Sequence, residues 1–202
     1  NLYIWATMNT SDQSLFPMDS AFKRRWDWEY VPITNAYKKN DEGEYELDDK
    51  GNKIPLKWKI KLEDNREIDW WTFLQSINKV IADLTTSEDK QLGYFFTKPD
   101  EKDDIISAKR FVSKVIFYLW NDVFKDYGFE PDCCKDANGK EVLYAKFYAD
   151  DGETVNQDVL KHFFSQLKDD KENPLWSEPK ETVQPQNESP DDEAEMKTTD
   201  EH

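Results

Sequence analysis

Hydrophobic residues recur every three or four positions in three parts of the chain, the spacing that places side chains on one face of an α-helix. A long stripe runs through residues 105–127 and stops at Gly128, a residue type that commonly ends helices. Another spans residues 154–167. The clearest stripe lies in residues 69–84 and comprises Trp70, Phe73, Leu74, Ile77, Val80, Ile81 and Leu84. We therefore expect three amphipathic helices.

Polar residues mark where two of these helices begin. Asp103 or Asp104 can cap the helix over residues 105–127, because a short acidic side chain accepts the free N–H groups of the first turn. Thr154 and Gln157 have the spacing of a capping box. The last helix is therefore predicted to start at Thr154.

Two apolar runs near the N-terminus have the character of strands. Residues 2–7 form a short run typical of a strand buried on both faces, and residues 26–33 alternate aromatic and β-branched residues with acids. Between them lies a polar loop and then a short helix over residues 20–25, with Asp19 as its N-cap. This order predicts a strand, a loop, a helix and a second strand.

Alternation of a different kind follows in residues 54–62, where apolar residues alternate with lysines after a turn cluster at residues 48–52. The pattern predicts a β-hairpin with one apolar face. Such a hairpin could bind a partner or probe DNA, or it could be an insertion that packs on the neighbouring helix. A second turn cluster, at residues 136–139, leads into a further predicted strand over residues 142–147.

Charge is spread unevenly along the chain. The 202 residues carry a formal net charge of −16, which argues against wrapping nucleic acid over a broad surface. Residues 168–202 hold twelve acidic and four basic residues, four prolines and little apolar periodicity. This stretch predicts a disordered acidic tail, because it cannot bury enough apolar surface to offset the loss of chain entropy.

The cysteine and membrane signals are weak. Cys133 and Cys134 are adjacent and lack the spacing of a metal site, which favours a reducing, cytoplasmic compartment. No run of about 18 apolar residues predicts a membrane span. His162 lies in an apolar helical stripe without a matching ligand, so we interpret it as structural, and no metal site is predicted.

The polar residues near the N-terminus suit nucleotide hydrolysis. A neutral amide at a strand end can orient the attacking water, and an arginine from a neighbouring subunit can stabilise the transition state. Asn9 follows the first predicted strand, and Arg24 and Arg25 end the short helix. The alternatives are that Asn9 is a turn residue or part of a guanine-reading motif, and that the arginines balance the nearby acids Asp27 and Glu29.

The residues around these positions resemble the sensor-1 and arginine-finger region of AAA+ ATPases. Residues 7–15 (TMNTSDQSL) and 18–26 (MDSAFKRRW) are similar to the McrB branch, the motor of modification-dependent restriction systems. Residues 77–81 (INKVI) and 91–96 (QLGYFF) are similar to the lid of that family, although the family's His-Ser pair is absent here.

The resemblance implies roles for individual residues. Asn9 would be the sensor-1 residue and would contact the nucleotide, Arg24 or Arg25 would be the finger that acts on a neighbouring subunit, and Asp19 would cap the finger helix. Which arginine reaches the phosphate stays open at this point, as does the identity of a sensor-2 residue.

The resemblance also implies the architecture, an α+β fragment. Residues 1–36 would be the C-terminal end of an AAA+ α/β core, with two strands and a short helix. Residues 37–66 would be a β-hairpin insertion, residues 67–167 a mainly helical lid, and residues 168–202 the acidic disordered tail.

The motif that binds phosphate is missing from the chain. No G-x-x-x-x-G-K-[ST] stretch is present, and no apolar run ends in Asp-Glu to hold Mg²⁺. We therefore expect no nucleotide to bind this fragment alone. The full-length protein would use ATP or GTP with Mg²⁺.

The family also implies partners. These are neighbouring AAA+ subunits in a ring, most often a hexamer, an McrC-like nuclease subunit, and DNA bound through an upstream domain and the partner. Two alternatives stay open: a MoxR-like remodelling chaperone, and a non-catalytic interaction module that kept the scaffold.

Overall fold

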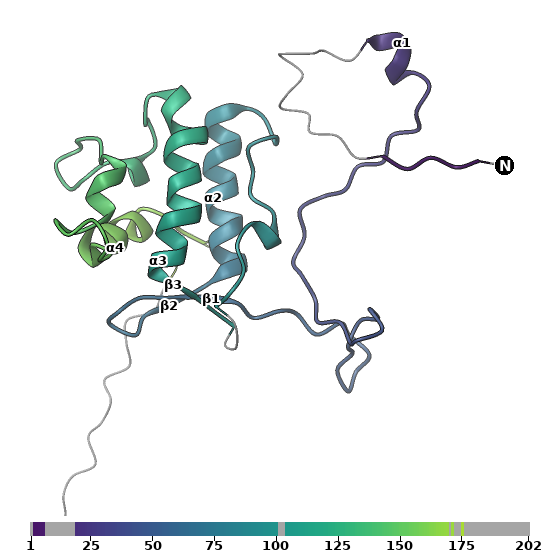
Figure 1. Ribbon diagram of the computed structural model, residues 1–202, viewed down its shortest axis with the longest axis horizontal. Coiled ribbons are helices and arrows are strands. Elements are labelled where there is room, and N and C mark those ends of the chain that lie inside the picture. The colour runs from purple at the N-terminus through teal and green to yellow at the C-terminus, as the bar shows by residue number, and fades with distance from the viewer. Residues whose placement is uncertain (1, 7–18, 101–103, 170, 172–174, 176–202) are drawn as a thin grey trace, which may run out of the picture.

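A computed structural model describes residues 2–6, 19–100, 104–169, 171 and 175. It has an α+β architecture, with several helices packed against a small three-stranded sheet (Figure 1). Residues 58–100 and 104–169 form a helical body, while residues 2–6 and 19–57 extend away from it as an arm (Figure 1). Among the described residues, no helix combines the length and the apolar character needed to cross a membrane.

Helix α2 (Trp70–Thr85) is the first helix of the body and confirms the first helical prediction. Its N-cap is Asp69, whose Oδ1 accepts a hydrogen bond of 2.8 Å from the backbone N–H of Thr72. The predicted apolar stripe faces the core. The residues of this helix that are fully buried are Trp70, Phe73, Leu74, Ile77 and Ile81.

A long helical rod packs beside α2. It begins with α3 (Ala108–Phe111) and continues through two π-helical segments and a 3₁₀ turn before it ends at Gly128, which has a φ of 66°. Those three segments are η3 (Val112–Ile116), η4 (Leu119–Val123) and η5 (Phe124–Tyr127).

The predicted start of this rod was wrong. Residues Ile105–Ser107 form strand β3 instead, and the cap is Ser107, whose Oγ accepts a bond of 3.3 Å from Arg110 N. The backbone of Asp104 is engaged in the sheet, since its carbonyl accepts from Lys59 N at 2.8 Å. Asp103 lies outside the described residues.

The sheet has the order β2-β1-β3, with β1 (Lys59–Lys61) in the centre. Strand β2 (Glu67–Asp69) pairs with β1 antiparallel, and β3 pairs with it parallel. The register aligns Ile60 with both Ile68 and Ile106, and all three side chains are fully buried. A row of isoleucines therefore forms the floor on which the helices pack.

The hairpin predicted for residues 37–66 was only partly right. A small β module (residues 36–56) does contain the turn at residues 48–52, with Gly51 at a φ of 79°. Its three segments close on each other through backbone bonds from Lys38 to Ile54, from Ile54 to Glu46 and from Glu46 to Lys38. The alternating stretch over residues 54–62 belongs to two structures. Its first residues lie in the small β module, and Lys59–Lys61 form strand β1 of the body.

Shorter elements complete the body. Helix α4 (Gln157–Ser165) starts later than predicted, because Asn156 rather than Thr154 caps it, and its Oδ1 accepts from Val159 N at 3.3 Å. The Thr154 hydroxyl instead donates to Asp151 at 2.6 Å. Besides η5, the described residues contain the 3₁₀ turns η2 (Tyr94–Phe96), η6 (Asp132–Cys134) and η7 (Tyr144–Phe147).

The strand predicted over residues 142–147 was wrong. Trp120 Nε1 donates to the carbonyl of Val142 at 2.6 Å, and Phe147 packs edge-on against the Trp120 ring with centroids 4.8 Å apart. These contacts fix the segment as a 3₁₀ turn over the long rod. Aromatic rings thus build much of the core, as their large buried areas allow.

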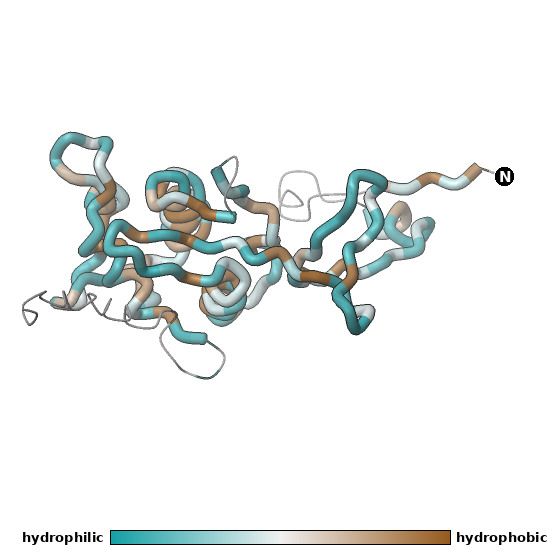
Figure 2. The backbone as a smooth tube through the Cα atoms, turned by 90° about the horizontal axis from the view of Figure 1, so that it is seen from below, coloured by the Kyte–Doolittle hydropathy of each residue, from teal (hydrophilic) through white to brown (hydrophobic). Residues whose placement is uncertain are grey.

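The apolar runs of the arm form no strands among the described residues. Residues 2–6 and 26–33 lack any ladder partner, and Trp5 is 87% exposed. Figure 2 shows hydrophobic residues near the N-terminus as well as inside the body. A strand needs hydrogen bonds from a neighbour. The prediction of two core strands is therefore not borne out within this chain.

The predicted acidic tail falls mostly outside the described residues. Of its members, the structure describes residues 168, 169, 171 and 175. Leu175 is buried in the core cluster. The expectation of a disordered tail stays a prediction for the rest.

Candidate functional site

Two arginines are presented directly after helix α1 (Ser20–Lys23). Asp19 occupies the predicted N-cap position, where its carbonyl, and not its side chain, accepts from the helix. Trp28 Nε1 donates to the carbonyl of Lys23 at 3.0 Å and so closes the other end. Arg24 and Arg25 follow in this turn, and both are exposed.

Neither guanidinium has a partner among the described residues. Within the part of the chain that the structure describes, the side chains of Arg24 and Arg25 form no hydrogen bond or ion pair. In particular, neither arginine pairs with the nearby acids Asp27 and Glu29. Two adjacent positive charges therefore face solvent. Such a pair is free to meet an anion on another molecule, and phosphate is a ligand that Arg binds well. Asn9 lies outside the described residues, as does the rest of residues 7–18.

The two segments that resemble the lid meet in the structure. The buried side chain of Asn78 on α2 donates to the carbonyl of Leu92 at 2.9 Å and accepts from its N–H at 2.7 Å. Gln91 Nε2 also donates to the Asn78 carbonyl at 3.3 Å. The amide of Asn78 thus holds the segment over residues 91–96 against α2.

Further bonds fix this segment from both sides. Trp70 Nε1 donates to the Tyr94 carbonyl at 2.8 Å, and the Tyr94 hydroxyl donates to the Leu56 carbonyl at 3.2 Å. Burial raises the pKa of Tyr94 to about 12, so its hydroxyl stays protonated. In the same segment, no atom lies within 4 Å of the position that a Cβ at Gly93 would take, and Phe95 is 59% exposed.

A hollow of about 570 Å³ separates residues 91–96, which we call the lid segment after their resemblance, from the small β module. Thr34 and Asn35, which directly precede the module, also line it. Two tyrosines and two lysines of the module form one wall, and the lid segment forms the other. These wall residues are Tyr37, Lys39, Tyr45, Lys53, Gly93, Tyr94 and Phe95.

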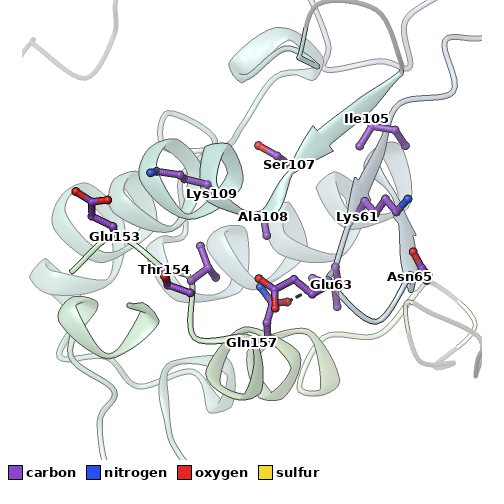
Figure 3. Close-up of a pocket in the computed structure, with 12 residues that line it drawn as sticks. Lys61, Glu63, Asn65, Ile105, Ser107, Ala108, Lys109, Glu153, Thr154 and Gln157 are labelled. Atoms are coloured by element: carbon purple, nitrogen blue, oxygen red, sulfur yellow. Dashed lines mark hydrogen bonds between the residues drawn. The ribbon is translucent and has the colours of Figure 1, made fainter. Parts of the chain in front are cut away.

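A second hollow, of about 440 Å³, lies at the end of the sheet beside α3 and α4 (Figure 3). Its charges are mixed, with Lys61 and Lys109 near Glu63 and Glu153. Gln157 points toward Glu63 and accepts from its N–H at 3.4 Å. Mixed charges of this kind favour no single class of ligand.

Metal and thiol chemistry find little support. The described residues contain no group of three or more His, Cys, Asp or Glu side chains that could hold a metal ion. Cys133 and Cys134 are buried and free. A hydrogen bond with Cys133, together with burial, raises the pKa of the Cys134 thiol and makes its thiolate rare. His162 lies on α4 and is half-buried.

Sequence reasoning missed two features. Asn78 was part of a recognised motif, but the sequence analysis did not predict that its side chain would bind the backbone of Leu92, a contact that we call the Asn78 clasp. A polar residue inside an apolar helical stripe was the feature that could have indicated it. The cluster of Tyr37, Tyr45, Lys39 and Lys53 was also missed. It joins residues from three short segments, and such pairing leaves no local periodicity.

Comparison with known proteins finds a relative among restriction enzymes. The chain is 38% identical over 125 residues to the type II restriction enzyme BsuMI component YdiS of Bacillus subtilis. The match covers 62% of this chain, which spans about a third of the length of that relative. No protein-family profile matches the chain, and no solved structure matches it significantly. The chain is therefore similar to part of a restriction enzyme component.

Proposed function

We propose that the chain is the arginine-finger and lid portion of a McrB-like AAA+ nucleoside triphosphatase that works in a restriction system. The observation that carries the proposal is the pair Arg24 and Arg25, which is exposed after a short helix and has no ion-pair partner among the described residues, within the pattern M-D-S-A-F-K-R-R-W. An arginine that acts on a neighbouring subunit has to leave its own fold. The geometry of this pair meets that requirement.

The restriction assignment is supported by similarity. The relative is named as a component of a type II restriction enzyme, and a component implies further subunits. A nuclease partner of McrC type is therefore part of the proposal, as is DNA as the final substrate.

The lid assignment is supported by the Asn78 clasp. Two separate stretches that resemble the family's lid are joined by two direct hydrogen bonds. The helices around them share one hydrophobic core, and we propose that they move as a unit over a bound nucleotide.

Hydrolysis needs parts that this chain does not hold. We propose that the phosphate loop and the acids that bind Mg²⁺ precede Asn1 in the same polypeptide, in line with the greater length of the relative. ATP or GTP would then bind between subunits of a ring. Asn9 would orient the attacking water, and one arginine would reach the γ-phosphate from the neighbouring copy.

The test is nucleotide turnover by that longer polypeptide. Arg24→Ala and Arg25→Ala are measured singly and together with ATP and with GTP, and Lys57→Ala serves as a control for loss of one exposed positive charge. The finger variant should lose about 10³-fold in rate or more, as fingers do elsewhere. Full activity in both single variants and in the double variant would remove the assignment.

A further inference from the structure

We propose that the hollow between the small β module and the lid segment receives an unstacked base of single-stranded DNA, with the neighbouring phosphates on Lys39 and Lys53. The chemistry comes from the wall residues alone, whereas the choice of DNA over RNA rests on the proposed function. No motif of the AAA+ resemblance includes this module.

The first step is the charge of the hollow. The chain has 43 acidic and 27 basic residues, yet the residues that line this hollow include two lysines and no carboxylate. Among the described residues, Lys39 and Lys53 form no ion pair. Their positive charges are therefore available to an external anion.

The second step is what holds these lysines. Lys53 Nζ lies 3.8 Å from the ring centroid of Tyr45 and 5.8 Å from that of Tyr37, and Lys39 Nζ lies 4.9 Å from Tyr45. A ring face attracts a cation without neutralising it. Both ammonium groups are thus held beside the Tyr45 ring, where they can contact phosphates.

The third step is the apolar wall. Phe95 is 59% exposed, and its ring packs edge-on against Trp58 at 5.6 Å, which fixes its orientation. Tyr37 is 37% exposed on the opposite wall. Exposed aromatic rings beside lysines are the arrangement that proteins use to stack single-stranded bases. A duplex cannot supply such a base, because its bases are already stacked.

The walls are also fixed relative to one another. The Tyr94 hydroxyl donates to the Leu56 carbonyl, and Leu56 N donates to the Ala36 carbonyl at 2.8 Å. These two bonds tie the lid segment to the start of the module. The hollow therefore belongs to the fold and does not depend on a free loop.

The test measures binding of a labelled 12-nucleotide dT strand to the 202-residue chain by fluorescence anisotropy at several salt concentrations. Each phosphate contact contributes about −0.7 to the slope of log affinity against log salt. The double variant that carries Lys39→Gln and Lys53→Gln removes two such contacts, so its slope should be flatter by about 1.4. Lys50→Gln, a lysine of the same module outside the hollow, should leave the slope unchanged.

Stacking is tested separately. Phe95→Ala should weaken binding by about ten-fold or more with the slope unchanged, and Phe95→Trp should restore it. Thermal unfolding of each variant shows that the fold is kept. The proposal is overturned if Lys50→Gln flattens the salt slope as much as the Lys39 and Lys53 changes do, or if the dT strand does not bind. It is also overturned if duplex DNA binds as tightly as the dT strand, or if an RNA strand binds more tightly.

These outcomes are independent of nucleotide turnover. If the Lys39, Lys53 and Phe95 variants lose DNA binding while the longer polypeptide that carries them still hydrolyses nucleotide, the result supports the proposed DNA surface without affecting the proposed function. Competition by free ATP or GTP at the same hollow would contradict the surface and identify it as a nucleotide site.

Discussion

The carboxamide of Asn78 pairs with the backbone of Leu92 as a strand partner would, donating to its carbonyl and accepting from its N–H. Both residues are buried. The pair joins the middle of α2 to a segment that has no ladder of its own. Buried backbone groups need partners, so this single side chain satisfies two of them at once.

Asn78→Ala should therefore be costly. The change leaves the N–H and carbonyl of Leu92 buried without partners, and we expect a loss of about 2 to 4 kcal/mol in the free energy of unfolding. Urea denaturation followed by tryptophan fluorescence measures it. Asn121→Ala removes a bond of the same type to the Phe117 carbonyl on an exposed surface and should cost less than about 0.5 kcal/mol. Equal losses in the two variants would contradict the clasp.

The start of α4 gives a prediction that separates the observed cap from the expected one. Asn156→Ala should lower the free energy of unfolding by about 1 kcal/mol, because Val159 N loses its acceptor. Asn156→Ser should recover most of this loss, since serine also caps well. A full loss in the serine variant would show that the asparagine acts in another way. Chemical denaturation measures both variants.

Stability should also depend on one acidic residue near the long rod. Partial burial disfavours the charge of Asp100, but hydrogen bonds from Ser107 and Arg110 prevail and hold the pKa of this carboxyl below its usual value. A carboxyl with a lowered pKa stabilises the fold above its unfolded pKa, near 4, and this contribution is lost as the pH falls through the folded pKa.

The corresponding variant is Asp100→Asn. The wild-type protein should lose stability as the pH falls from 5 to 2, and the variant should lose less over the same range because it has no such carboxyl to protonate. Asp83→Asn, at an exposed position of α2, should follow the wild type. Thermal unfolding at a series of pH values measures all three proteins. Parallel curves for the wild type and Asp100→Asn would refute the prediction.

The thiols should be inert in the folded protein. Cys133 and Cys134 are buried, and the raised pKa of Cys134 leaves little thiolate at neutral pH. We expect neither to react with Ellman's reagent within minutes at pH 7.5, and both to react at once in 8 M urea. Rapid labelling of the native chain would contradict the described burial.

The helices could be predicted from the sequence because each has a continuous apolar stripe. The sheet could not. Its strands are three residues long, too short for a period to appear, and β1 pairs with β3 across more than 40 residues of chain. Such pairing depends on the packed isoleucines Ile60, Ile68 and Ile106, and not on local preference.

Part of the candidate site could likewise be found from the sequence, and part of it could not. The resemblance of residues 18–26 singled out Arg24 and Arg25, and the structure shows both residues exposed after a short helix. The roles of both arginines and of Asn9 stay predictions. The tyrosine–lysine cluster could not be predicted, because the closed hydrogen bonding of the small β module is what assembles it.

The most direct test of the central claim is complementation between two inactive forms of the longer polypeptide. One form carries Arg24→Ala and Arg25→Ala, and the other lacks the lysine of the proposed phosphate loop. Each alone should fail to hydrolyse ATP or GTP, and the mixture should recover hydrolysis, because a ring that contains both has interfaces with an intact loop and an intact arginine pair. A mixture that forms mixed rings and stays inactive would contradict action of these arginines on a neighbouring copy.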